Sequence, residues 1–130
     1  MRQILLLSVL LLAGCAKDIK FQALPLASSG KAAVRVELTY NRNDTLRVKI
    51  SNAPEPSTLN PRYTRYVLWV ATTDRQSIVN AGQLRVENGK AELMTLTPLR
   101  KFILSITAEA QGDATTPGPD VLFQTKEINW

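Results

Sequence analysis

Apolar residues recur at every second position over several segments of this chain. Residues 34–40, 46–50 and 102–108 each alternate in this way, as strands with one buried face do. No stretch of useful length carries the 3.6-residue period of an amphipathic helix. The pattern therefore predicts an all-β fold of antiparallel strands that bury one face in a common core.

Short polar turns separate the predicted strands. A loop of three or five residues after the first alternating segment keeps both apolar sides on one face. One such register sets Leu38 opposite Leu46, and it brings Glu37 near Arg47 or Lys49. The strands on either side of this loop are expected to be neighbours in one sheet.

The Asn-Gly pair at 88–89 gives the clearest local signal. Both residues tolerate positive φ, which predicts a two-residue type I′ hairpin. This turn sets Glu87 opposite Lys90 and Arg85 opposite Glu92, so both outward pairs carry opposite charges. We therefore expect residues 83–93 to form one continuous hairpin.

Residues 66–70 are apolar on both faces, which predicts a central strand with Trp69 in the core. Three prolines between residues 52 and 61 exclude a central strand there and predict a surface connection between sheets. About seven short strands in roughly a hundred residues favour an immunoglobulin-like antiparallel β-sandwich. A small closed barrel is the alternative, because periodicity does not fix the strand order.

The start of the chain has the pattern of a secretory leader. Arg2 precedes an apolar run over residues 4–13, which is half the roughly 20 residues that a membrane-spanning helix needs. The run ends in a motif that resembles the lipobox of bacterial lipoproteins, with small residues before a cysteine: Leu12-Ala13-Gly14-Cys15.

This resemblance implies cleavage between Gly14 and Cys15, and a diacylglycerol on the Cys15 thiol with a further acyl chain on the new amino terminus. Two or three acyl chains hold a protein on a membrane essentially permanently. Ala16 follows the cysteine, and the absence of Asp at that position implies the outer membrane, with the domain facing the periplasm. No other cofactor is expected.

Three segments follow from these patterns. Residues 1–14 are predicted to be the signal peptide, residues 15–32 the lipidated cysteine with a flexible tether, and residues 33–130 the β-sandwich. The second segment has no convincing period and contains Pro25 and a Ser-Ser-Gly stretch, which are typical of a linker.

Composition removes many kinds of catalytic site. The chain of 130 residues has no histidine and one cysteine, so it holds no Ser-His-Asp or Cys-His site, no zinc site that needs histidine and no internal disulfide. Glu109 is the one carboxylate whose place at the end of an apolar strand suggests burial and a raised pKa. We expect no enzymatic activity and no metal site.

The formal charge of +5 indicates a mildly basic surface. Arg62, Tyr63 and Arg65 form a short basic-aromatic cluster of the kind that contacts nucleic acids. Exposed arginines at the entry of a strand explain this cluster better, because a secreted domain does not meet nucleic acid. We therefore expect no nucleic-acid partner.

The second half of the chain resembles the extracytoplasmic domain of anti-sigma-K factors, over about residues 63 to 124. The segments that carry the resemblance are Tyr66-Val67-Leu68-Trp69-Val70, Asn80-Ala81-Gly82, Phe102 through Glu109, and Thr116-Pro117-Gly118-Pro119. It implies a β-sandwich on the outer side of a membrane. The cytoplasmic sigma-binding segment, the spanning helix and the His/Cys zinc motif of the family have no counterpart, so sigma-factor inhibition is not implied.

These features predict a membrane-anchored lipoprotein whose sandwich acts without catalysis, through contacts with an envelope protein or a cell-wall polymer. An alternative is a module that binds carbohydrate or peptidoglycan, with Tyr63 or Trp130 as stacking groups. A hydrolase that uses Glu109 is a third hypothesis, in which glycoside cleavage needs a second carboxylate about 5–9 Å from the first.

Overall fold

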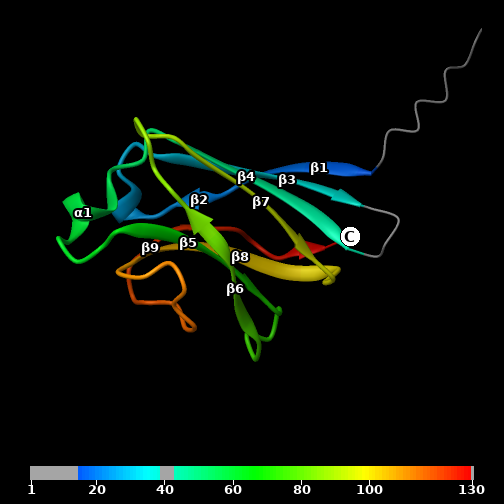
Figure 1. The fold of residues 1–130 in the computed structure, drawn as a ribbon. Helices are drawn as coiled ribbons and strands as arrows, with labels where there is room; N and C mark the ends of the chain where they lie inside the picture. The colour runs from blue at the N-terminus through cyan, green and yellow to red at the C-terminus, as the bar shows by residue number, and fades with distance from the viewer. Residues whose placement is uncertain (1–14, 39–42, 130) are drawn as a thin grey trace, which may run out of the picture.

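The computed structural model describes residues 15–38 and 43–129, which fold into two antiparallel sheets packed face to face (Figure 1). The strands of the described chain are β1 (Ala16–Lys20), β2 (Gln22–Ala23), β3 (Lys31–Leu38), β4 (Asp44–Ser51), β5 (Arg65–Ala71), β6 (Ile78–Leu84), β7 (Ala91–Thr97), β8 (Lys101–Glu109), β9 (Val121–Gln124) and β10 (Ile128–Asn129), with a 3-10 turn η1 (Pro25–Ala27) and a short helix α1 (Pro56–Leu59). The predicted β-sandwich is confirmed. The two sheets stay separate, with edge strands, so the closed barrel is excluded.

The four-stranded sheet has the order β1-β3-β4-β7. Its inward residues pair across the strands, with Val34 opposite Val48 and Val36 opposite Leu46, and all four are buried. The period-two pattern places charged residues on the other face of the same strands. Leu38 pairs with Asp44 rather than Leu46, a shift of two residues that leaves the apolar face unchanged.

The second sheet has six strands in the order β2-β9-β8-β5-β6, and β10 also pairs with β8. β5 lies between β8 and β6, as its continuous apolar run predicts. The proline-rich connection 52–64 crosses from β4 in one sheet to β5 in the other and includes α1. This crossing was also predicted, because proline cannot donate to a sheet ladder.

The two faces of β5 are buried by different neighbours. Tyr66, Leu68 and Val70 belong to the core between the sheets, with Phe102, Ile106 and Phe123 from β8 and β9. Trp69 is fully buried, as predicted, but the period of two directs it to the opposite face of the six-stranded sheet.

A polar segment, residues 110–120, is held over this second face of β5. Asn80 lies directly opposite Trp69 in the β5–β6 pairing. Its side-chain nitrogen donates to the carbonyl oxygens of Gly112 and Ala114 at 2.8 and 2.9 Å. Trp69 is therefore buried on a sheet face that is external to the sandwich.

Residues 15–32 were predicted to be a flexible tether, but this segment contains β1, β2 and η1. β1 pairs with β3 along its whole length, from Ala16 opposite Glu37 to Lys20 opposite Ala33. Phe21 and Ala27 belong to the core. Within residues 15–38 and 43–129, the sandwich therefore begins at Ala16 rather than residue 33. These residues form ten strands instead of about seven. The prediction failed because β1 is an exposed edge strand, held by backbone pairing, whose side chains show almost no alternation of burial.

The turn at 88–89 is confirmed, but the continuous hairpin is not. Glu87 and Lys90 exchange backbone hydrogen bonds of 2.8 and 3.0 Å, and both turn residues have positive φ. Beyond that pair the two arms separate, since β6 pairs with β5 and β7 with β4. The turn thus carries the chain from one sheet to the other, and Glu92 forms its ion pair with Lys49, 3.5 Å away, rather than with Arg85.

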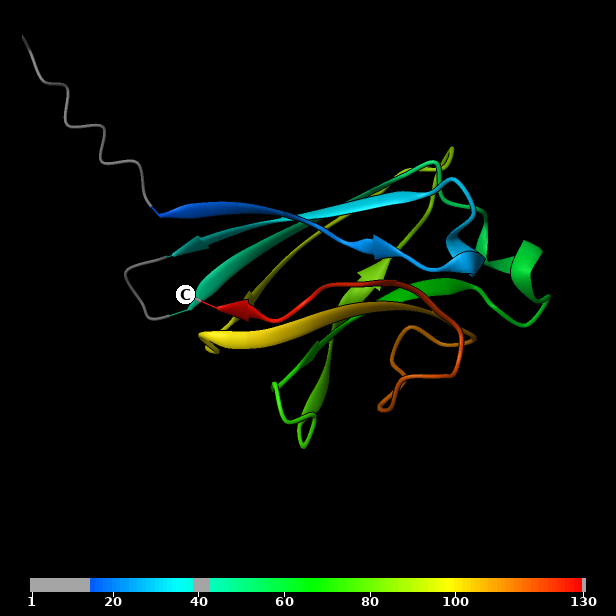
Figure 2. The same ribbon diagram turned by 180° about the vertical axis from the view of Figure 1, so that it is seen from behind.

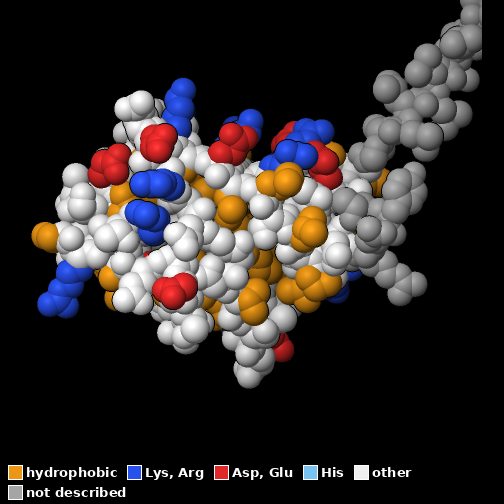
Figure 3. Space-filling model, in the orientation of Figure 1, with side chains coloured by type: hydrophobic (Ala, Val, Ile, Leu, Met, Phe, Trp, Pro, Cys, Tyr) orange, Lys and Arg blue, Asp and Glu red, His pale blue; other side chains and the backbone are white. Residues whose placement is uncertain are grey.

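The side of the sandwich where β6 and β7 form the sheet edges carries exposed apolar residues. Val79, Met94 and Leu96 are more than half exposed. Figure 3 shows hydrophobic side chains distributed across this side, with charged side chains along the margin formed by β3 and β4.

At one end of the molecule, the start of β1 lies near the end of β3, the start of β8 and β10 (Figure 2).

Candidate functional site

Cys15 is exposed and directly precedes β1. Its carbonyl oxygen accepts a hydrogen bond from the backbone nitrogen of Leu38 at 3.1 Å. The residue that was predicted to be lipidated therefore directly precedes a strand of the four-stranded sheet. Gly14, on the other side of the predicted cleavage point, lies outside the described residues, and so does Trp130.

Two of the predicted contact residues, Tyr63 and Glu109, lie near segment 110–120, which is held over the outer face of the six-stranded sheet. Tyr63 is half-buried and its hydroxyl donates to a carboxylate oxygen of Asp120. This hydrogen bond, burial and the negative charges of Asp120 and Glu109 raise the pKa of the Tyr63 hydroxyl. The ring also packs against the core, so Tyr63 does not present a fully exposed stacking surface.

Glu109 ends a chain of side-chain hydrogen bonds that starts at Trp69. The indole nitrogen of Trp69 donates to Oγ1 of Thr107 at 2.8 Å, and that hydroxyl donates to Oε2 of Glu109 at 2.5 Å. The same carboxylate oxygen accepts from the backbone nitrogen of Gly118 at 2.9 Å. Alternate positions of β8 place Thr107 and Glu109 on the face of the sheet that carries Trp69.

This arrangement connects β5, β8 and segment 110–120. A Cβ atom at Gly118 would lie 3.1 Å from Oε1 of Glu109, so the residue at this position must be small for the backbone to reach the carboxylate. Glu109 is 8% exposed, and donors within the fold occupy one of its carboxylate oxygens. Glu109 therefore links segment 110–120 to β8 through the hydrogen bond that its carboxylate accepts from Gly118.

A wide groove lies on the outer face of the four-stranded sheet, at the end away from Cys15. Its volume is about 980 Å³. Ala33 and Ser51 are short side chains on this face, and longer side chains surround them. The lining residues come from β1 to β4, the 88–89 turn and β7: Lys20, Phe21, Ala23, Gly30, Lys31, Ala32, Ala33, Lys49, Ile50, Ser51, Arg85, Glu87, Lys90, Ala91 and Glu92. We refer to this site as the lysine groove.

The lysine groove has an excess of positive charge. Its lining includes five cationic side chains and two carboxylates. Lys49 pairs with Glu92 at 3.5 Å, but both side chains remain about 70% exposed. Within the described part of the chain, Lys20, Lys31 and Lys90 take part in no ion pair.

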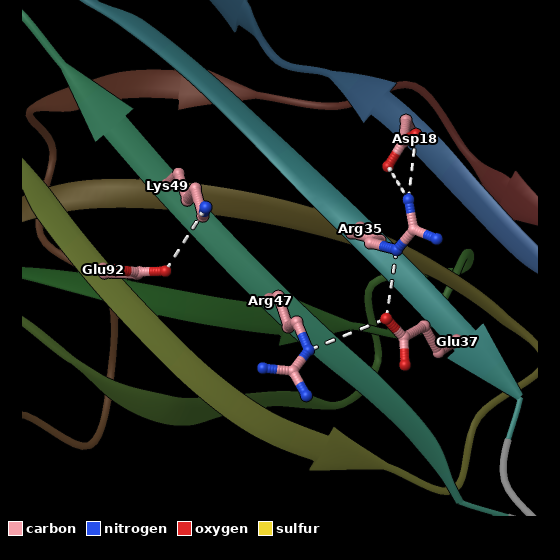
Figure 4. Close-up of polar contacts among 6 residues, drawn as sticks. All are labelled: Asp18, Arg35, Glu37, Arg47, Lys49 and Glu92. Carbon is pink, nitrogen blue, oxygen red and sulfur yellow. Dashed lines mark hydrogen bonds and ion pairs between the residues drawn. The ribbon is translucent and has the colours of Figure 1, made fainter.

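The half of this sheet face nearer Cys15 is neutralised by its own charges. Arg35 contacts Asp18 at 3.3 Å and Glu37 at 3.0 Å, and Arg47 reaches the same Glu37 oxygen at 3.6 Å (Figure 4). These four residues form a ladder across β1, β3 and β4. Glu37 therefore lies near Arg47, one of its two predicted neighbours.

Sequence reasoning missed the lysine groove. Its only signal was one exposed lysine on each of four segments, and two of those segments were assigned wrongly. Lys20 fell in the predicted tether, and Lys90 was placed in a hairpin paired only with residues 83–87. The site becomes visible once β1 and β7 are known to lie on either side of β3 and β4.

Comparison with models of known protein families and with curated protein sequences finds no match. The resemblances to bacterial lipoproteins and to the anti-sigma-K domain therefore stay predictions. In the described part of the chain, no helix has the length and apolarity needed to cross a membrane. The same residues contain no cluster of three or more metal-ligating side chains of the His, Cys, Asp and Glu types.

Proposed function

We propose that this chain is a lipid-anchored β-sandwich that acts by binding another component of the bacterial envelope, without catalysis. The observation that carries the proposal is the position of Cys15, which is exposed and lies immediately before the first strand. A thiol at that place is accessible for acylation without any change in the fold. The lipobox pattern that precedes this residue supports the acylation of its thiol.

The position of Cys15 also orients the domain. Acyl chains on this residue hold the adjoining end of the four-stranded sheet at the lipid surface. β1 then leads away from the membrane for five residues, or about 16 Å, and ends at Lys20 in the lysine groove. The groove is thus presented to the periplasm, where a soluble or membrane-bound partner can reach it. The proposal also places the anchor of the protein in the outer membrane.

The test is in-cell crosslinking of the tagged protein, followed by mass spectrometry, with a secreted Cys15→Ala variant as control. Labelling with radioactive palmitate checks the anchor separately. We expect the label on the natural chain only, and capture of one envelope protein that depends on Cys15. Unlabelled, unprocessed protein in the cytosol would overturn the anchoring, and capture of cell-wall fragments alone would replace the protein partner by a polymer.

A further inference from the structure

The lysine groove places one lysine on each of four neighbouring segments. Lys20, Ala33, Lys49 and Glu92 follow one another across β1, β3, β4 and β7 in a single row of the sheet. Lys31 lies opposite Ser51 in the next row. Lys90 extends that row, because Ala91 pairs with Ile50. The four lysines therefore alternate between two rows in a line that runs across the strands.

The spacing of this line suits an extended chain. Successive lysines lie on neighbouring strands about 4.8 Å apart and alternate between two rows about 6.8 Å apart, so across the strands the four lysines advance by about 4.8 Å each and span about 14 Å in all. An extended peptide projects every second side chain to one side at about 6.8 Å. The flexible lysine stems cover the difference.

We propose that the lysine groove binds an extended acidic segment of a protein partner, lying across β1, β3, β4 and β7. This inference rests on the proposed function, since it names the class of partner for the interaction module. The excess of positive charge in the groove complements acidic side chains. Such complementarity steers association and fixes the register of a bound chain.

The composition of the groove favours a polypeptide over a uniformly charged polymer. Glu87 and Glu92 lie at the β7 end among Lys90 and Arg85, and they repel an unbroken polyanion. A peptide can offer acidic side chains to Lys20 and Lys31, which form no ion pair in the described chain, and a neutral or basic one near the two glutamates. Its apolar side chains can also cover the short residues between the lysines.

The experiment measures binding by fluorescence anisotropy to the full-length protein, purified in a non-ionic detergent. The probe is a labelled peptide of alternating glutamate and valine, and polygalacturonate of equal charge serves as competitor. The variant Lys20→Glu/Lys31→Glu reverses two groove charges that form no ion pair in the described chain. The control Lys101→Glu/Lys126→Glu changes the net charge equally, at exposed residues outside the groove. Circular dichroism checks that both variants fold.

We expect the groove variant to bind the peptide about tenfold more weakly, because two exposed charge interactions become repulsive, and the control to change less than threefold. Equal losses in both variants would overturn the proposal, since net charge alone would explain them. Failure of the natural chain to bind the peptide would also overturn it, as would competition by polygalacturonate at concentrations equal to the peptide. None of these results affects palmitate labelling or Cys15-dependent crosslinking, so the proposed function is judged separately.

Discussion

Asp44 is the one residue of the described chain whose buried side-chain oxygens accept no hydrogen bond. Its side chain is 1% exposed, and its nearest cation is Arg100, at 3.6 Å and itself half-exposed. Burial raises the pKa of the Asp44 carboxyl and the Arg100 charge lowers it by less. The ionised carboxylate therefore destabilises the fold at neutral pH.

We expect Asp44→Asn to stabilise the protein by about 1 kcal/mol at pH 7, because the charge is removed while the shape is kept and Arg100 stays solvated. The folded-state pKa lies above the ordinary value of 3.8, so the penalty falls as pH drops through the folded pKa and disappears below 3.8. Urea unfolding at pH 7 and pH 3 measures both effects, with Asp18→Asn as the exposed control. A less stable Asp44→Asn variant at pH 7 would show that the Arg100 pair outweighs burial.

Thr107 has a different role, because its hydroxyl both accepts and donates within a buried chain of hydrogen bonds. Thr107→Val keeps the volume but leaves the Trp69 indole nitrogen without its acceptor and removes one donor to Glu109. We expect a loss of about 2 kcal/mol in the free energy of unfolding, measured by urea titration. Thr64→Val removes a hydroxyl that donates to the Ala110 carbonyl at the exposed surface and should lose less than half as much. Equal losses would mean that burial of this chain adds nothing.

At the scale of elements, β1 distinguishes a paired strand from a flexible tether. Trypsin requires several residues in an extended, accessible conformation, which β1 does not offer while it pairs with β3. We expect cleavage after Lys20 to be much slower than cleavage after Lys126, an exposed residue between β9 and β10. Mass spectrometry of a timed digest gives both rates. Comparable rates would indicate that β1 detaches readily and that the tether describes the molecule better.

Some of the strands could be predicted from the sequence pattern, and others could not. The alternation in β3, β4 and β8 and the apolar run in β5 predicted the strands correctly, since burial on one or both faces determines which residues a strand can carry. β1 could not be predicted because an exposed edge strand needs no apolar pattern. The arms of the 88–89 turn could not be assigned to different sheets, because local charge pairs fit a hairpin equally well. The lysine groove forms only when β1 pairs with β3 and β7 pairs with β4. Because neither pairing was predicted, the groove was not predicted either.

The molecule as a whole has two ends with different surroundings if Cys15 is acylated. Lys17 donates to the carbonyl oxygen of Asn129 at 2.9 Å, and Asn129 pairs with Lys101, so Lys101 lies at the Cys15 end. The lysine groove lies toward the other end of the sheet, where β1 ends and β3 begins. A membrane at Cys15 therefore shields one group of lysines and leaves the other in solvent.

Cys15 is the only cysteine, so the domain produced from Cys15 onward without the leader, and therefore not acylated, can be coupled through its thiol to a maleimide lipid in neutral vesicles. We expect acetylation of Lys101 to slow about threefold or more on the vesicles, while Lys20, Lys31 and Lys90 react as in solution, since only groups within a few ångströms of the headgroups lose access to reagent. Quantitative mass spectrometry of the acetylated peptides reads both groups in one sample, and uncoupled protein mixed with the same vesicles is the control. Slower reaction of the groove lysines would mean that the sheet lies flat on the lipid. The groove would then be closed to a periplasmic partner, and the orientation that follows from an anchor directly before β1 would be wrong.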